Sequence, residues 1–164
     1  MEIILAKEQH VERILEIYDG ARRYMKESGN PHQWGDLYPS EALVRADLAA
    51  GQLFLCVEGE EILGVFVYFE GHEPTYDRIF DGAWLNNRPA GVMHRVAVAK
   101  HGCGVVAFCF AYCFEQCQNL KIDTHRDNLP MQRALAKFGF VRCGKILLSN
   151  GDDRWAYQKS GFPS

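Results

Sequence analysis

The stretch VAVAKHGCGVV, residues 96 to 106, joins small and branched residues to two glycines, Gly102 and Gly104, and then to an apolar segment. A helix whose first turn is rich in glycine presents free backbone N–H groups and the positive end of its dipole to an anion. Lys100 and His101 precede this turn and would add charge-assisted contacts, the histidine only when protonated. The stretch predicts a phosphate-binding site, and a tight turn without a ligand is the alternative.

The two common nucleotide-binding motifs fit this turn less well. The dinucleotide fingerprint follows the first strand of its domain, whereas the strand before Gly102 is the fourth in this chain. No Gly-Lys-Ser or Gly-Lys-Thr sequence of a P-loop occurs. The phosphate-binding interpretation therefore depends on the rest of the chain.

A second candidate for chemistry is the set of cysteines. Cys109, Cys113 and Cys117 are four residues apart and would lie on one stripe of a helix. A zinc site would need paired thiolates on a tight turn and a fourth ligand at matching spacing. Because the surrounding residues are apolar almost all round, we expect these cysteines to pack in the core, with a metal or redox site as the alternative.

Composition sets the class of protein. The 164 residues, 48% hydrophobic and 24% charged, predict a single globular domain over residues 1–164. A net charge of −3 argues against nucleic acid or an anionic membrane as a partner. The N-terminal sequence is neither a signal peptide nor a membrane span, so we expect a cytoplasmic protein whose six cysteines are reduced.

Hydrophobic periodicity and turn residues predict eleven elements, beginning with a strand and two helices. The order is β-α-α-β-β-β-α-β-α-β-β, an α/β fold in which a mixed, mostly antiparallel sheet has helices on both faces. Ser40 is expected to cap the second helix, and Gly139 to end the last one. The expected ranges are 2–6, 9–26, 41–50, a hairpin within 52–70, 91–99, 105–118, 121–124, 129–138 and a final hairpin around Asn150-Gly151.

The run from MHRVAVAKHGCGVV through IDTHRDNLPMQRALAKFGFVRCG resembles the core of the GNAT-type N-acetyltransferases. In that family a strand, a glycine-rich turn and a helix bind acetyl-CoA, and a strand and an Asn-started helix follow. Gly102 and Gly104 match the last two fixed places of the family's turn signature. The order of elements from Glu2 to Lys159 also matches, and the segments around Trp84 and QWGDLYPS resemble small bacterial members of unassigned substrate.

Two positions depart from the family pattern. The Gln/Arg place of the turn signature falls on Ala99, so one pyrophosphate contact is missing or comes from Lys100. Many members carry a tyrosine that protonates the leaving thiolate, and that place is Leu135 here. The departures keep open a second function, a catalytically silent acyl-CoA-binding module of the same fold.

The resemblance implies positions for the cofactor. Val96 and Val98 would offer backbone groups to the pantetheine arm, and the pyrophosphate would lie on the amides of residues 101 to 105. Asn128 would contact the cofactor arm and also cap its helix. The implied cofactor-binding residues are Val96, Val98, Lys100, His101, Gly102, Cys103, Gly104, Val105 and Asn128.

Direct acetyl transfer to a primary amine, through a tetrahedral intermediate, needs a base to remove the proton from an ammonium group of pKa about 10.4. We expect His94 and His125 to be the catalytic bases, because both stand at strand ends beside the cofactor and imidazole titrates near neutrality. Glu70 and Asp123 are weaker alternatives. The candidate acids in place of Leu135 are Tyr68, Tyr112 and Tyr157.

Two long loops are expected to shape the acceptor pocket, which would take a small-molecule or peptide amine. The expected substrate-binding residues are Trp34, Tyr38, Tyr76 and Trp84, with negative charge for a cationic amine from Asp36, Asp77 and Asp81. No metal is expected. Many relatives pair through a sheet edge, which suggests a homodimer.

Overall fold

The computed structural model describes residues 1–162, and its elements follow the predicted order. A short 3₁₀ helix precedes the first α-helix, and a second one lies in the loop between the third and fourth strands. The elements are β1 (Glu2–Leu5), α1 (Val11–Glu27), α2 (Glu41–Ala49), β2 (Leu53–Glu58), β3 (Glu61–Glu70), β4 (Gly91–Val98), α3 (Val105–Cys117), β5 (Asn119–Thr124), α4 (Leu129–Phe138), β6 (Val141–Leu147) and β7 (Asp153–Ser160).

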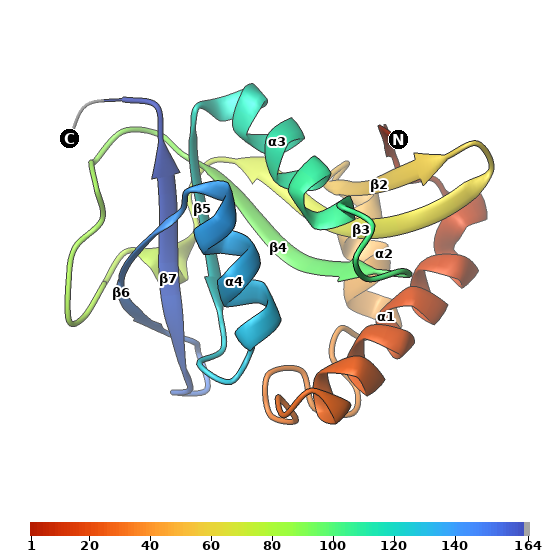
Figure 1. Ribbon diagram of the computed structural model, residues 1–164, viewed down its shortest axis with the longest axis horizontal. Coiled ribbons are helices and arrows are strands. Elements are labelled where there is room, and N and C mark those ends of the chain that lie inside the picture. Colours follow the sequence, from red (N-terminus) through yellow and green to blue (C-terminus); the bar gives the residue numbers. More distant parts are fainter. Residues whose placement is uncertain (163–164) are drawn as a thin grey trace.

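The strands form one seven-stranded sheet in the order β1-β2-β3-β4-β5-β7-β6 (Figure 1). All neighbours are antiparallel except β4 and β5, which confirms the predicted mixed sheet. These two strands pair only at Gly91 with Leu120 and at Val92 with Lys121. Beyond those pairs β4 and β5 diverge, and the opening between them is where the cavities described below lie.

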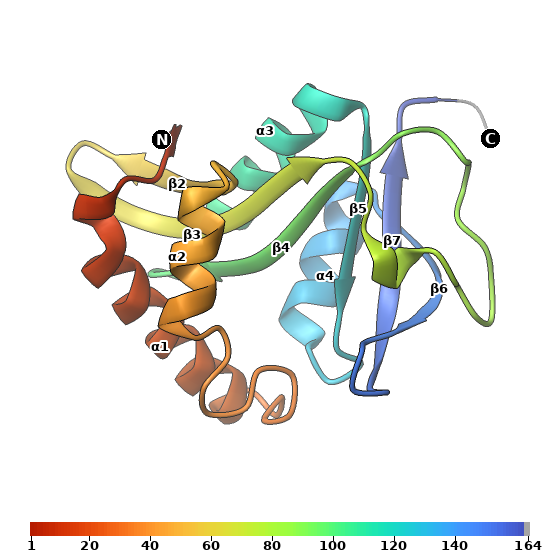
Figure 2. The ribbon, with the colours of Figure 1, turned by 180° about the vertical axis from the view of Figure 1, so that it is seen from behind.

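Helices cover both faces of the sheet. Helices α3 and α4 lie in front of the sheet in Figure 1, and α1 and α2 lie on the opposite face, seen from the front in Figure 2. Each face has its own core, built around Phe66, Phe110 and Leu135 under α3 and α4, and around Ile14, Leu53 and Val67 under α1 and α2. Within residues 1–162 no helix combines the length and the apolar character needed to cross a membrane.

The cysteines of α3 belong to the core, as the packing interpretation predicts. Cys109 and Cys113 are buried in the cluster under α3, and Cys117 packs against it. Burial raises the pKa of the Cys113 thiol, which therefore stays protonated at neutral pH. No group of three or more His, Cys, Asp or Glu side chains in the described part of the chain is arranged to hold a metal ion.

The predicted helix caps are present. The Ser40 hydroxyl accepts the N–H of Leu43 at 3.1 Å, and Gly139 ends α4 in a left-handed conformation with φ of 99°. Several boundaries differ from the predicted ones by one or two residues, and β5 begins at Asn119, two residues before the predicted start. The reason is tertiary: the Asn119 side chain is buried and accepts a hydrogen bond from the Gln158 amide of β7 at 2.7 Å.

Candidate functional site

The glycine turn between β4 and α3 has the geometry of an anion site. Gly102 and Gly104 have φ of 77° and 74°, a region that residues with a Cβ rarely adopt. A Cβ at either position would meet no atom within 4 Å, so conformation and not crowding requires glycine. No side chain caps α3 at Gly104, and the first-turn amides can therefore receive a ligand.

A cavity of about 770 Å³ begins at this turn and runs between β4, α3, α4 and α1. Such a volume suits a cofactor-sized ligand. Cys103 does not line it, because its side chain is exposed and its thiol lies 3.7 Å from the carbonyl oxygen of His101. The other predicted cofactor residues do line the cavity, namely Val96, Val98, Lys100, His101, Gly102, Gly104, Val105 and Asn128.

The charge expected of His101 is absent at neutral pH. Its ring stacks on Tyr24 with 3.7 Å between centroids, and burial lowers the pKa of the imidazole. The Lys100 ammonium lies at the surface, 3.2 Å from Glu61. His101 therefore offers the cavity a flat ring rather than a positive charge.

Two cations that the sequence reasoning missed lie on α4. Arg133 and Lys137 line the cavity one helical turn apart. Neither forms an ion pair with any described residue, so both remain free to meet a phosphate. Their i, i+4 spacing on the helix that follows Asn128 was the available signal.

A β-bulge shapes β4 beside this cavity. Arg95 and Val96 together stand opposite Phe66 of β3, and Arg95 has a left-handed φ of 49°. The Tyr18 hydroxyl donates to the Arg95 carbonyl at 2.9 Å. The Arg95 guanidinium binds both oxygens of the buried Asp47 carboxylate, each at 2.8 Å. The bulge is thereby held from two helices, and it directs Val96 toward the opening between β4 and β5.

A second cavity, of about 560 Å³, lies beyond the bulge and contains the predicted base His94. The His94 ring is 18% exposed and lies between two carboxylates, with Nε2 3.6 Å from Glu73 and Nδ1 3.9 Å from Asp123. The Tyr76 hydroxyl donates to Asp123 at 2.6 Å and fixes that carboxylate. The proximity of His94, together with a hydrogen bond from Thr75, lowers the pKa of Glu73, which is ionised at neutral pH.

The two cavities meet. Four residues line both of them: Met25, Val96, Asn128 and Met131. The Asn128 side chain accepts the N–H of Met131 at 3.1 Å as the cap of α4, and it donates to Gln33 at 2.8 Å. A ligand held by the glycine turn can therefore reach a second ligand in the His94 cavity at this junction.

Comparisons with known proteins assign the fold to a family. No protein-family model matches the sequence, and no curated protein matches it significantly. A GNAT-family acetyltransferase from Streptococcus agalactiae is 29% identical, with a TM-score of 0.87 over 98% of this chain and 95% of that one. A Staphylococcus aureus protein assigned as an acetyltransferase is 26% identical, with a TM-score of 0.71 over 98% and 99%. The chain has the fold of the GNAT acetyltransferases and is similar to members of that family.

A more distant structure shares this fold and contains a ligand. It is a Salmonella typhimurium protein assigned as an acetyltransferase and solved with its cofactor acetyl-CoA. The identity is 17%, and the TM-score is 0.62 over 99% of this chain and 97% of that one. The family resemblance read from the glycine turn and the Asn-started helix is thus confirmed at the level of the superfamily and its fold.

The departures from the family pattern have structural consequences in this chain. Ala99 packs against the core under α1, and Leu135 is fully buried under α3, so neither faces a ligand. Burial raises the pKa of Tyr157. None of the three candidate acids lines either of the two cavities: Tyr68, Tyr112 and Tyr157.

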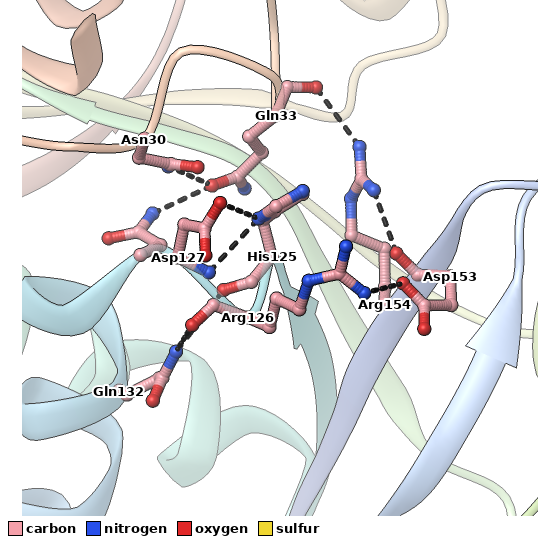
Figure 3. A network of polar contacts seen from close by, with 9 residues as sticks. Asn30, Gln33, His125, Arg126, Asp127, Gln132, Asp153 and Arg154 are labelled. Carbon is pink, nitrogen blue, oxygen red and sulfur yellow. Dashed lines mark hydrogen bonds and ion pairs between the residues drawn. The ribbon is translucent and has the colours of Figure 1, made fainter.

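His125 does not lie where a base is needed in this GNAT fold. It is 7% exposed and lines neither cavity. Its Nδ1 accepts the backbone N–H of Asp127 at 3.0 Å (Figure 3), and the Gln132 amide donates to its carbonyl at 3.2 Å. The expected pairing of His94 with His125 is therefore not realised, and the placement favours a structural role for His125 in the turn before α4.

That role predicts a pH dependence of stability. Burial, and next the charge of Arg154, lower the pKa of His125 below its unfolded value of about 6.5. The native state then binds fewer protons than the unfolded state, so the free energy of unfolding falls as pH drops below about 6.5. Urea unfolding at about pH 7.5 and 5.5 should show a smaller loss for His125→Asn than for the wild type.

His101 provides a second case of the same effect, because burial lowers its pKa as well. His101→Asn should also flatten the dependence, and the double variant should flatten it further. An unchanged loss of stability in His125→Asn would refute the assignment.

The expected acceptor residues lie in two different places. Trp34 and Tyr38 line the second cavity, whereas Tyr76 and Trp84 do not. Their rings pack together at 5.2 Å in a small core with Ile146, and the Trp84 indole donates to the Tyr76 carbonyl at 2.9 Å. Within the loop 71–90, Glu73 and Thr75 line the second cavity, whereas Tyr76 and Trp84 pack in this small core.

The negative charge of the second cavity also has another origin than expected. It comes from Glu73, Asp123 and Asp152, all of which line the cavity. The three loop aspartates form ion pairs with Lys26, His72 and Lys145 and line neither cavity: Asp36, Asp77 and Asp81. Glu70, an alternative base, is likewise absent from the linings of both.

Proposed function

We propose that the chain transfers the acetyl group of acetyl-CoA to a primary amine of a small molecule or peptide. The observation that carries this proposal is the junction of the two cavities at Val96 and Asn128. One cavity begins at an uncapped helix N-terminus, and the other contains a histidine between two carboxylates. The similarity to a GNAT-family acetyltransferase, and the distant neighbour with acetyl-CoA, support the choice of donor.

The first cavity fits the donor in chemistry and size. The pyrophosphate would lie on the first amides of α3, with Lys100, Arg133 and Lys137 as cationic partners. The pantetheine arm would follow Val96 and Val98 toward the junction. Because both valines line the cavity and α4 closes its other side, the thioester would arrive beside the bulge.

The second cavity would hold and deprotonate the amine. An alkyl ammonium has a pKa of about 10.4, so it must lose a proton before it can attack the thioester carbonyl. Glu73 and Asp123 attract the cation and orient the His94 ring, which takes the proton. With Leu135 buried, the thiolate leaves as an anion or takes a proton from water, as its pKa of about 8.5 allows.

Donor binding is tested by thermal unfolding. Acetyl-CoA at about 100 times its Kd should stabilise the protein by roughly 2.7 kcal/mol, which for a domain of this size raises Tm by about 5 to 10 °C. Desulfo-CoA should give a similar shift because it keeps both the phosphates and the pantetheine arm, and NADH, which has a pyrophosphate but no such arm, should give none. Arg133→Gln should reduce the shift with either CoA ligand. A protein whose Tm ignores saturating acetyl-CoA would end the proposal.

A second function, an acyl-CoA-binding module without turnover, is favoured by one observation. No tyrosine hydroxyl of the candidate acids reaches either cavity, and Leu135 is buried. Such a module would show the same thermal shift with acetyl-CoA. It would form no acetylated amine when product is measured by mass spectrometry, which separates the two functions.

A further inference from the structure

Arg154 of β7 is a buried cation without a carboxylate partner. It is 6% exposed and lines the second cavity. Its guanidinium donates to the backbone carbonyls of Asp153 at 2.8 Å and Gln33 at 3.0 Å (Figure 3). No Asp or Glu oxygen among residues 1–162 lies within 4.0 Å of it. An arginine has five N–H donors, so two recorded hydrogen bonds leave capacity for a ligand.

Two other arginines of this structure each lie beside a carboxylate, which Arg154 does not. The guanidinium of Arg95, whose side chain is 14% exposed, is matched by both oxygens of Asp47. The carboxylate of Asp153 lies 3.6 Å from Arg126, which is 60% exposed, and not on Arg154. A buried charge without an opposite charge is costly, and an anionic ligand would remove that cost.

A second polar group of the same cavity also lacks a partner. The Thr124 hydroxyl is buried and forms no hydrogen bond with any described residue. Thr124 ends β5 and lines the second cavity together with Arg154. The two groups reach the cavity from opposite faces of the sheet, because Thr124 pairs with Trp155, the residue next to Arg154 on β7.

The sheet places Arg154 near the proposed base. Asp123 of β5 pairs with Ala156 of β7, and alternation along β7 puts Arg154 on the same face as Ala156. Asp123 and Arg154 are therefore diagonal neighbours, about 7 to 8 Å apart. The His94 ring lies 3.9 Å from Asp123. A ligand with an amine beside His94 would therefore need only a few bonds to reach the Arg154 guanidinium.

We propose that the acceptor is an amine that also carries a carboxylate a few bonds away, as an amino acid does, and that Arg154 binds this carboxylate. The inference rests on the proposed acetyl transfer and specifies its substrate class. The amino group lies between Glu73 and Asp123, beside His94, and the carboxylate takes the free donors of Arg154. Trp34 and Tyr38 contact the remaining side chain of the acceptor.

Matched acceptors test the proposal. The acetylation of phenylalanine, tryptophan, histidine and lysine is compared by mass spectrometry with that of the corresponding decarboxylated amines. Dipeptides, in which the carboxylate lies farther from the amine, form a third arm. We expect kcat/KM to be about 10- to 100-fold higher for at least one amino acid than for its decarboxylated amine, as a charge-assisted bidentate contact provides. Equal or higher values for the decarboxylated amines or the dipeptides would overturn the proposal.

Variants separate binding of the carboxylate from a structural role. Arg154→Gln should raise KM for the preferred amino acid about 10- to 100-fold and change KM for the decarboxylated amine less than about twofold. Arg154→Lys, which keeps the charge, should recover part of the loss. Arg126→Gln is the matched control, since that arginine is exposed and lines neither cavity, and it should keep the preference.

Two results overturn the proposal and leave the proposed function intact. One is an equal loss with both acceptors in Arg154→Gln, and the other is a wild type that acetylates amines without preference. Failure of the proposed function looks different, because the Tm shift with acetyl-CoA would then be absent. If the protein binds acetyl-CoA but forms no product, binding of the amino acid can still be measured. It should raise Tm of the desulfo-CoA complex in the wild type and not in Arg154→Gln. No increase in the wild type would overturn the proposal.

Discussion

Asp47→Ala is expected to lower the free energy of unfolding by about 3 to 5 kcal/mol, because it removes a buried carboxylate and leaves the largely buried guanidinium of Arg95, 14% exposed, without its partner. Arg95 also holds a left-handed backbone conformation, which costs energy and persists only when contacts enforce it. For a domain of this size the loss corresponds to a fall in Tm of about 6 to 20 °C. Urea and thermal unfolding measure it directly.

The control is an exposed ion pair of α1. The side chains of Arg13 and Glu16 are 47% and 67% exposed, and Glu16→Ala should cost less than about 1 kcal/mol. Adding Arg95→Ala to Asp47→Ala should restore part of the stability, since no unpaired charge then remains. A cost for Asp47→Ala as small as that for Glu16→Ala would show that the pair does not hold the bulge.

His94→Gln is expected to lower kcat/KM for amine acetylation by about 10² to 10⁴-fold at neutral pH, the usual contribution of a general base. The shift in Tm with acetyl-CoA should be unchanged, because His94 lines the second cavity and not the first. The deficit should narrow as pH rises from about 7 to 9.5, since a growing share of the amine is then already neutral. Rates of product formation across this range measure the effect.

Two other histidines serve as controls for this variant. His72 is exposed and pairs with Asp77, and His125 lies outside both cavities, so His72→Gln and His125→Asn should keep most of the activity. A deficit in His94→Gln that stays constant with pH would instead indicate a positioning role. Glu73→Gln should then show the same flat profile, because the two side chains are 3.6 Å apart.

Much of the donor side of the site was predictable from the sequence. Local signals determine it: Gly102 and Gly104 start a helix without a cap, and Asn128 caps the next helix. Each of these features depends on residues within a few positions along the chain, where conformational preferences act directly. The order of the elements was predictable for the same reason, since periodicity and turn residues are also local.

The acceptor side was decided by tertiary structure. Tyr76 and His125 have residue types that suit a pocket. In the structure the Tyr76 ring packs in a small core, and the His125 imidazole accepts a hydrogen bond in the turn before α4. Arg95, Asp47 and Arg154 gave no signal in the sequence, because their roles come from contacts between residues 48 or more positions apart.

The sequence by itself therefore determined the fold, the family resemblance and the anion-binding turn. Only the tertiary structure decided how β4 and β5 separate, where the bulge directs Val96, and which charges meet in the acceptor cavity. The physical reason is that burial and ion pairing depend on the full set of neighbours in space, whereas helix starts and turns depend on neighbours along the chain.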